Sequence, residues 1–166
     1  MSNCIEHSIY GANRVQTLNV LVAGSAEKVR GKLIDVVTER GHRVHEASGE
    51  DEAWSCFTEH IPALIFLADV TPETLSLCRR IRKSPAGKGT VIIAILYPYV
   101  REQLQAALKA GADECIMESL AQPERLRARI AFAEQQARTK QERQAAEDEL
   151  RASEAKARAI IETTVE

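Results

Sequence analysis

Short apolar runs alternate with amphipathic segments over the first two thirds of the chain. The runs LNVLVAG (18–24), HRVHEA (42–47), ALIFLA (63–68), TVIIAILY (90–97) and ADECIM (112–117) have the length expected of strands. Segments with apolar residues at helical spacing follow them at 25–41, 48–60, 72–84, 100–111 and from Pro123 onward. This alternation predicts an α/β fold, a parallel sheet of five strands with helices on both faces.

The last third of the chain has a different pattern. Residues 131–166 contain no glycine or proline and are rich in Ala, Glu, Arg, Lys and Gln, which predicts one long helix. One heptad-like apolar seam consists of Leu126, Ile130, Ala133 and Ala137, and a second of Ala146, Leu150, Ser153, Ala157, Ile160 and Thr164. The polar stretch RTKQERQ separates the seams, which differ in register by one residue.

We expect these seams to form a parallel two-stranded coiled coil between two copies of the chain. A solvated single helix is the alternative. The expected organisation is a flexible leader over 1–17, a folded domain over 18–130 and a helical linker over 131–166. The full chain is then a homodimer, whereas residues 1–125 are mostly monomeric.

Composition excludes several classes of partner. The net charge is −2, from 22 Lys and Arg against 24 Asp and Glu, so no global field favours nucleic acid. The longest apolar run, VIIAIL, is too short to span a membrane, and the N-terminus lacks the pattern of a signal peptide. We therefore expect a cytoplasmic protein. Because its cysteines form no CxxC pair, we also expect reduced thiols. His42 and His45 are expected at the surface rather than in a metal site.

Five motifs carry a resemblance to the receiver domain of two-component response regulators, over Asn19 to about Ala133. They are VLVAGSAEKVRGKL, GHRVHEASGEDEAW, PALIFLADVTP, LCRRIR and LKAGADECIMESLAQPERLRARI. The resemblance implies a doubly wound, flavodoxin-like sheet in the order 2-1-3-4-5, with a site at the carboxyl ends of the strands. In that family an acid pair and a third-strand aspartate hold Mg²⁺, and the same aspartate accepts a phosphoryl group. A Ser or Thr and a Lys bind the phosphoryl oxygens.

The required residue types are missing from every one of these places. Alignment of the motifs puts the acid pair at Gly24 and Ser25, the nucleophile at Ala68, the hydroxyl at Leu96 and the lysine at Glu118. The resemblance therefore implies a pseudo-receiver, non-enzymatic, with no metal and no cofactor. A small ligand in the vacated site is a weaker alternative, with Gly24, Ser25, Leu96 and Glu118 as its lining.

Asp69 is the alternative phosphoacceptor. It comes one residue after the expected place, and side chains alternate faces along a strand, so we expect its carboxylate to point away from the site. The competing interpretation is a turn residue or a helix cap ahead of PETLSL.

The end of the chain, LRASEAKARAIIETTVE, resembles the helical lead-in to a PAS sensory domain. The resemblance implies a longer signalling protein whose output is a histidine kinase or a cyclic-dinucleotide enzyme. The function expected from all these observations is a dimerising regulatory module that passes a conformational signal through its C-terminal helix to a downstream unit. A separate protein partner is a further expectation, and a passive dimerising spacer is the rival interpretation.

Overall fold

The computed structural model describes residues 16–117 and 122–165. Its sheet has five parallel strands in the order β2-β1-β3-β4-β5. They are β1 (Asn19–Ala23), β2 (Arg43–Ala47), β3 (Leu64–Leu67), β4 (Val91–Ile95) and β5 (Glu114–Ile116). Each strand lies within its predicted run, and the predicted fold class and strand order are confirmed.

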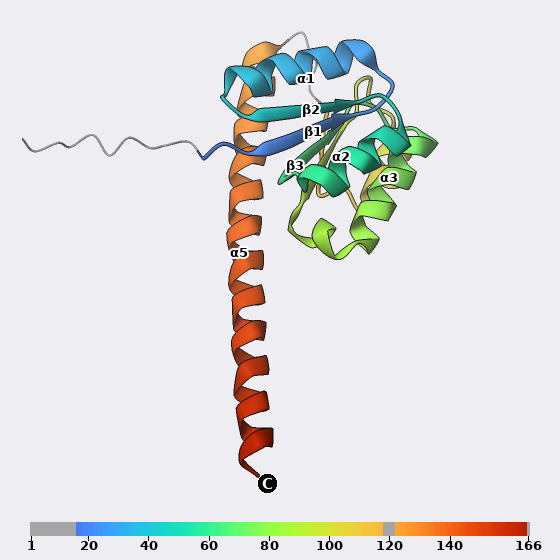
Figure 1. The fold of residues 1–166 in the computed structure, drawn as a ribbon. Helices are drawn as coiled ribbons and strands as arrows, with labels where there is room; N and C mark the ends of the chain where they lie inside the picture. Colours follow the sequence, from blue (N-terminus) through green and yellow to red (C-terminus); the bar gives the residue numbers. More distant parts are fainter. Residues whose placement is uncertain (1–15, 118–121, 166) are drawn as a thin grey trace, which may run out of the picture.

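Helices cover both faces of this sheet (Figure 1). They are α1 (Glu27–Glu39), α2 (Glu50–His60), α3 (Pro72–Lys83), α4 (Arg101–Ala110) and α5 (Pro123–Thr164), with the 3-10 helix η1 (Pro85–Gly89) before β4. Helices α1 and α5 pack on one face, and α2, α3 and α4 on the other. The short helix η1 was not predicted. It begins with Pro85 after Ser84, whose hydroxyl accepts from the Gly87 N–H at 3.3 Å.

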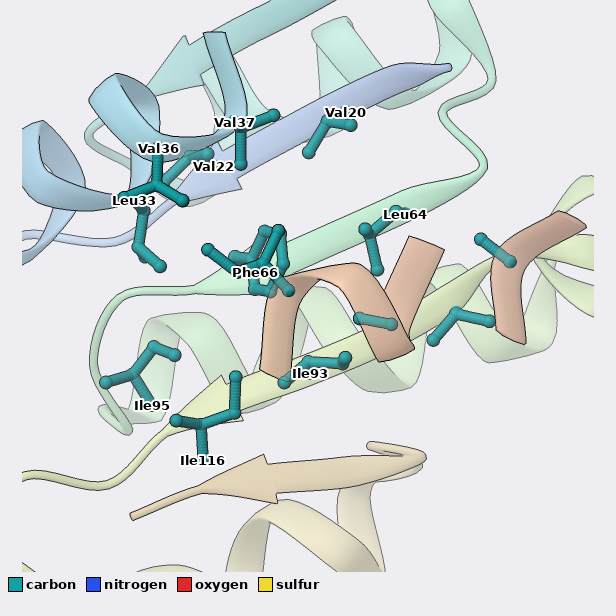
Figure 2. Packing of buried hydrophobic residues seen from close by; sticks show 14 of the residues in the cluster. Val20, Val22, Leu33, Val36, Val37, Leu64, Phe66, Ile93, Ile95 and Ile116 are labelled. Carbon is teal, nitrogen blue, oxygen red and sulfur yellow. The ribbon is translucent and has the colours of Figure 1, made fainter. Parts of the chain in front are cut away.

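Apolar side chains alternate along each central strand between two separate cores. In β1, Val20 and Val22 face α1 and α5, whereas Leu21 faces the opposite helices. Figure 2 shows the first core, in which Phe66 of β3 lies between strand neighbours and the side chains of α1. Since both faces are covered, the central strands need apolar residues at every position, which explains their uninterrupted apolar runs.

The first apolar seam of the C-terminal helix lies inside this core. Leu126, Ile130, Ala133 and Ala137 are at most 1% exposed and pack against the chain's own sheet. The prediction that they form a coil seam between two copies was therefore wrong. The stripe is apolar because the first turns of α5 cover the sheet, and the domain continues past the predicted boundary at residue 130.

A buried carboxylate also ties α5 to the domain. Glu134, 1% exposed, accepts a hydrogen bond from Arg40 Nη2 at 2.8 Å, and Arg40 Nε donates to its other oxygen. This hydrogen bonding raises the pKa of Arg40. His42 Nε2 lies 2.9 Å from Glu134 Oε1, while its Nδ1 accepts from the Leu18 N–H at 3.2 Å. His42 is thus buried, which corrects the prediction of a surface histidine.

Beyond Glu134, the side chain of Lys140 makes a further contact between α5 and the domain, after which the helix extends away from it. Lys140 Nζ donates to the Thr90 carbonyl at 2.9 Å and lies 3.3 Å from Asp113 Oδ1. After Gln144 every described residue of the helix is exposed, and α5 extends well beyond the globular part (Figure 1). Within the described residues, no helix carries an apolar stretch long enough to span a bilayer.

Candidate functional site

The carboxyl ends of β1, β3 and β4 meet at one edge of the sheet, where ligands bind in doubly wound folds. Gly24 directly follows β1, with φ +133°, and its N–H donates to the Ala47 carbonyl at 3.1 Å. Ala68 directly follows β3, and its N–H donates to the Ala23 carbonyl at 2.7 Å. These bonds bring three of the predicted positions, Gly24, Ser25 and Ala68, to the same edge.

Asp69 projects into this edge and binds the start of α1. Its Oδ2 accepts hydrogen bonds from the Ser25 N–H at 2.7 Å, the Ser25 hydroxyl at 2.7 Å and the Ala26 N–H at 2.8 Å. Helix α1 begins at the next residue, so the carboxylate satisfies amides that precede the first turn and lies near the positive end of the helix dipole. Asp69 therefore acts as a helix cap supplied by a distant loop.

The direction of the Asp69 side chain contradicts the sequence-based expectation that it faces away. Strand β3 ends at Leu67, and residues 68 and 69 form a bend, so the alternation of a strand no longer applies to Asp69. Asp69 is not the cap of α3 either. Thr71 caps that helix in a reciprocal capping box with Thr74, and only the Asp69 carbonyl takes part, accepting from Thr74 Oγ1 at 3.1 Å.

The same geometry leaves no room for a side chain at position 24. A Cβ built on Gly24 would lie 2.9 Å from Asp69 Oδ1, and the positive φ is itself unfavourable for any residue with a side chain. Asp69 Oδ1 is buried and has no hydrogen-bond partner within the described chain. Glycine at 24 and aspartate at 69 are thus a matched pair.

A residue that the sequence did not single out completes this arrangement. Arg30 of α1 is 8% exposed; its Nη1 donates to the Gly24 carbonyl at 2.6 Å, and its Nε pairs with Glu46 at 2.9 Å. In the sequence, Arg30 is an ordinary polar residue near the start of a predicted helix, and nothing there indicates that it is buried. Arg30 and Asp69 thus hold the loop after β1 by separate hydrogen bonds.

The remaining predicted positions carry no phosphoryl-binding group in the described structure. Ala68 is 3% exposed, and Leu96 is 1% exposed within the core beneath α2, α3 and α4. Glu118 lies outside the described residues. Among residues 16–117 and 122–165, no group of three His, Cys, Asp or Glu side chains is arranged to hold a metal ion. The residues at this edge do not fit the Mg²⁺ that the family site requires, because Asp69 is bound to α1 and the acid pair is Gly24 and Ser25.

Two hollows flank the Asp69 loop. The larger, about 230 Å³, is lined by Ala26, Val29, Ala68, Asp69, Val70, Thr71, Ile95, Tyr97, Pro98, Val100 and Gln103. The smaller, about 80 Å³, is lined by Ala23, Gly24, Ser25, Ser48, Gly49, Glu50, Thr71, Glu73, Thr74 and Leu77. Leu96, predicted as a lining residue of a vacated cleft, borders neither of these hollows.

Comparison with known proteins identifies the fold. No family model matches the chain, and no curated protein does. Among solved structures, a putative response regulator from Chloroflexus aurantiacus J-10-fl is similar, with TM-score 0.63 and 22% identity over 72% of this chain and 98% of that one. A CheY-like receiver domain protein from Methanospirillum hungatei JF-1 has TM-score 0.63 and 19% identity, covering 74% and 98%.

A longer protein is also similar. NtrX from Brucella abortus, in complex with ADP, gives TM-score 0.63 and 20% identity over 80% of this chain but only 29% of its own length. The chain therefore has the receiver-domain fold of two-component response regulators. At these identities the similarity establishes the fold alone.

Proposed function

We propose that this chain is a non-enzymatic pseudo-receiver, a regulatory module of a two-component-type signalling protein that uses the receiver fold without phosphorylation. The observation that carries this proposal is the position of the Asp69 carboxylate. It is engaged by the start of α1, where a working site would hold a metal ion and present a free oxygen.

The chemistry of phosphoryl transfer supports the same conclusion. Transfer to a carboxylate brings two anions together, and a bound divalent cation normally offsets that charge. Here Asp69 Oδ2 already accepts three hydrogen bonds, and Oδ1 is buried against Gly24. A phosphoryl group on either oxygen would have to break the α1 cap, with neither a carboxylate at position 24 nor one at 25 to recruit a metal.

The alternative, a true phosphoacceptor at Asp69, is tested by incubation with acetyl phosphate and Mg²⁺ followed by intact-mass measurement. We expect no added phosphoryl group and no change in melting temperature with Mg²⁺ and beryllofluoride. Asp69→Asn is the matched control. Stoichiometric phosphorylation of the native chain that is lost in Asp69→Asn would overturn the proposal.

The proposed output is mechanical. Helix α5 runs for 42 residues from the domain core to Thr164, with no glycine or proline after its first residue, Pro123. Glu134 and Lys140 fix its first half to the globular domain, so a tilt of the domain moves the helix as well. We propose that the exposed second seam, which includes Leu150 and Ile160, pairs with that of a second copy and passes this motion to a downstream sensor or output unit.

A passive spacer is the rival function, and dimer geometry distinguishes the two. Spin labels on Glu59→Cys, at an exposed position of α2, report the distance between the two globular domains of a dimer. A module that transmits motion requires one narrow distance distribution, since each domain is fixed to its helix. A broad distribution would indicate domains that move independently of the coil, as a spacer allows.

A further inference from the structure

The second seam of α5, which begins at Ala146, continues toward the N-terminus of the helix along the part that lies beside the domain. Steps of three and four residues back from Ala146 reach Arg143, Thr139, Gln136 and Phe132. The heptad frame therefore crosses RTKQERQ without a shift. The register break expected from the sequence disappears, because the first seam belongs to the core of the single chain.

This face is separate from the one that packs on the sheet. At 3.6 residues per turn, Phe132 lies roughly 120° around the helix from the middle of the buried stripe. Phe132 is 54% exposed, Leu150 60% and Ile160 66%, so large apolar side chains stand uncovered along one line. We infer that a second copy's α5 packs along this whole line, from Phe132 to Thr164, beside the globular domains as well as below them. The inference rests on the proposed dimer and extends its interface.

Gln136, one of these seam positions, is partly buried where α5 meets its own domain. Its Oε1 is buried and has no hydrogen-bond partner within the described chain. In a parallel, in-register pair Gln136 occupies a core position of the seam, opposite Gln136 of the second copy, whose amide N–H groups are donors. A polar residue at a core position favours the register in which the two copies of that residue lie opposite each other.

A groove lies beside the same face. It has a volume of about 480 Å³ and is lined by Val91, Asp113, Phe132, Gln135, Gln136, Thr139, Lys140 and Arg143. Four of these residues are the seam positions themselves. Arg143, at a core position, lies 3.8 Å from Glu147 of its own helix, and in a parallel pair Glu142 of the second copy would be a further ionic neighbour. The seam face of α5 therefore borders an open groove on its own domain, beside which a second α5 would lie.

Symmetric disulfide cross-linking tests the extended seam. The parent variant carries Cys4→Ser and Cys56→Ser but keeps Cys78 and Cys115, since burial raises the pKa of each to about 11. Thr139→Cys and Phe132→Cys probe the upper seam, the extension from Phe132 to Arg143 beside the domain. Ala157→Cys probes the lower seam, from Ala146 to Thr164. Gln141→Cys and Ala155→Cys, on the opposite side of the helix in the same heptads, are the matched controls.

We expect cross-linked dimer from all three seam probes and at least about tenfold slower cross-linking from the two controls, since a disulfide requires Cβ atoms within about 4.5 Å. Cross-linking at Ala157→Cys without Thr139→Cys or Phe132→Cys would overturn the extended seam and leave the proposed dimer intact. Cross-linking at none of the three, or equally at all five, would overturn both. As a second measurement, Phe132→Ser should weaken dimerisation at least several-fold while leaving the melting temperature of the domain unchanged.

Discussion

The Asp69 carboxylate occupies the space that a side chain at position 24 would need: a Cβ on Gly24 would lie 2.9 Å from Asp69 Oδ1. Gly24→Asp, which restores the first acid of a working receiver, should therefore destabilise the domain. The positive φ and the contact between two carboxylates predict a loss of about 2–4 kcal/mol in the free energy of unfolding. Urea denaturation measures it.

The double-mutant cycle of Gly24→Ala with Asp69→Ala separates steric conflict from backbone strain. Removal of the carboxylate should recover about 1–2 kcal/mol of the cost of Gly24→Ala, since only strain at φ +133° then remains. Strictly additive effects would show that the two side chains do not meet as described.

Glu134 should contribute far more to stability than the surface ion pairs of the same helix. Glu134→Gln removes the charge that Arg40 and His42 face in a buried position, with an expected loss of about 1–3 kcal/mol because Arg40 is partly exposed. Arg127→Ala is the matched control, as its exposed pair with Glu39 also joins α5 to α1 and should change stability by less than about 0.5 kcal/mol. Equal losses of stability in the two variants, measured by thermal denaturation, would mean that the buried Glu134 contacts stabilise the protein no more than the exposed Arg127 pair.

The fold was predictable because its signals are local. Runs such as ALIFLA and VIIAIL identify central strands. Gly41 and Gly111, both with positive φ, stand at the ends of two predicted helical segments, where glycine commonly ends a helix. The stripe at Leu126 and Ile130 was equally clear, but periodicity does not say what covers an apolar stripe. A helix of 42 residues that packs first on its own sheet and then projects outward carries two stripes with different partners.

The sequence predicted which functional groups the site lacks, but not how the residues that are present are arranged. The missing acids at Gly24 and Ser25 were evident, whereas the direction of Asp69 depends on where β3 ends, to within one residue. Strand boundaries are the least certain part of sequence interpretation, and one residue reverses the face of a side chain. The Arg30 and Glu134 contacts join residues far apart in the chain or hidden among polar positions, so no local pattern indicates them.

Two thiols should be inert to Ellman's reagent in the native protein. Burial raises the pKa of Cys78 and Cys115 to about 11, so at pH 8 the reactive thiolate is depleted by about two orders of magnitude relative to an ordinary thiol. In a Cys4→Ser variant we expect one fast thiol, Cys56, which is half-buried, and two more only in denaturant. As pH rises toward 11 the native rate of the two slow thiols should increase. Rapid reaction of all three at pH 8 would contradict the packing of the second core.

The length of α5 that the domain needs can be measured by truncation. A chain ending at residue 125, expected from the sequence to be mostly monomeric, lacks Leu126, Ile130, Ala133 and Ala137. It should fail to fold, because it exposes one face of the sheet. A chain ending at residue 144 keeps those four and the Lys140 contacts but loses the lower seam. It should melt cooperatively and be monomeric by light scattering, whereas residues 1–166 are dimeric. A dimer of the 144-residue chain would show that the globular domain or the Phe132–Arg143 face of α5 associates without the second seam, and a monomeric full chain would overturn the proposed coiled coil.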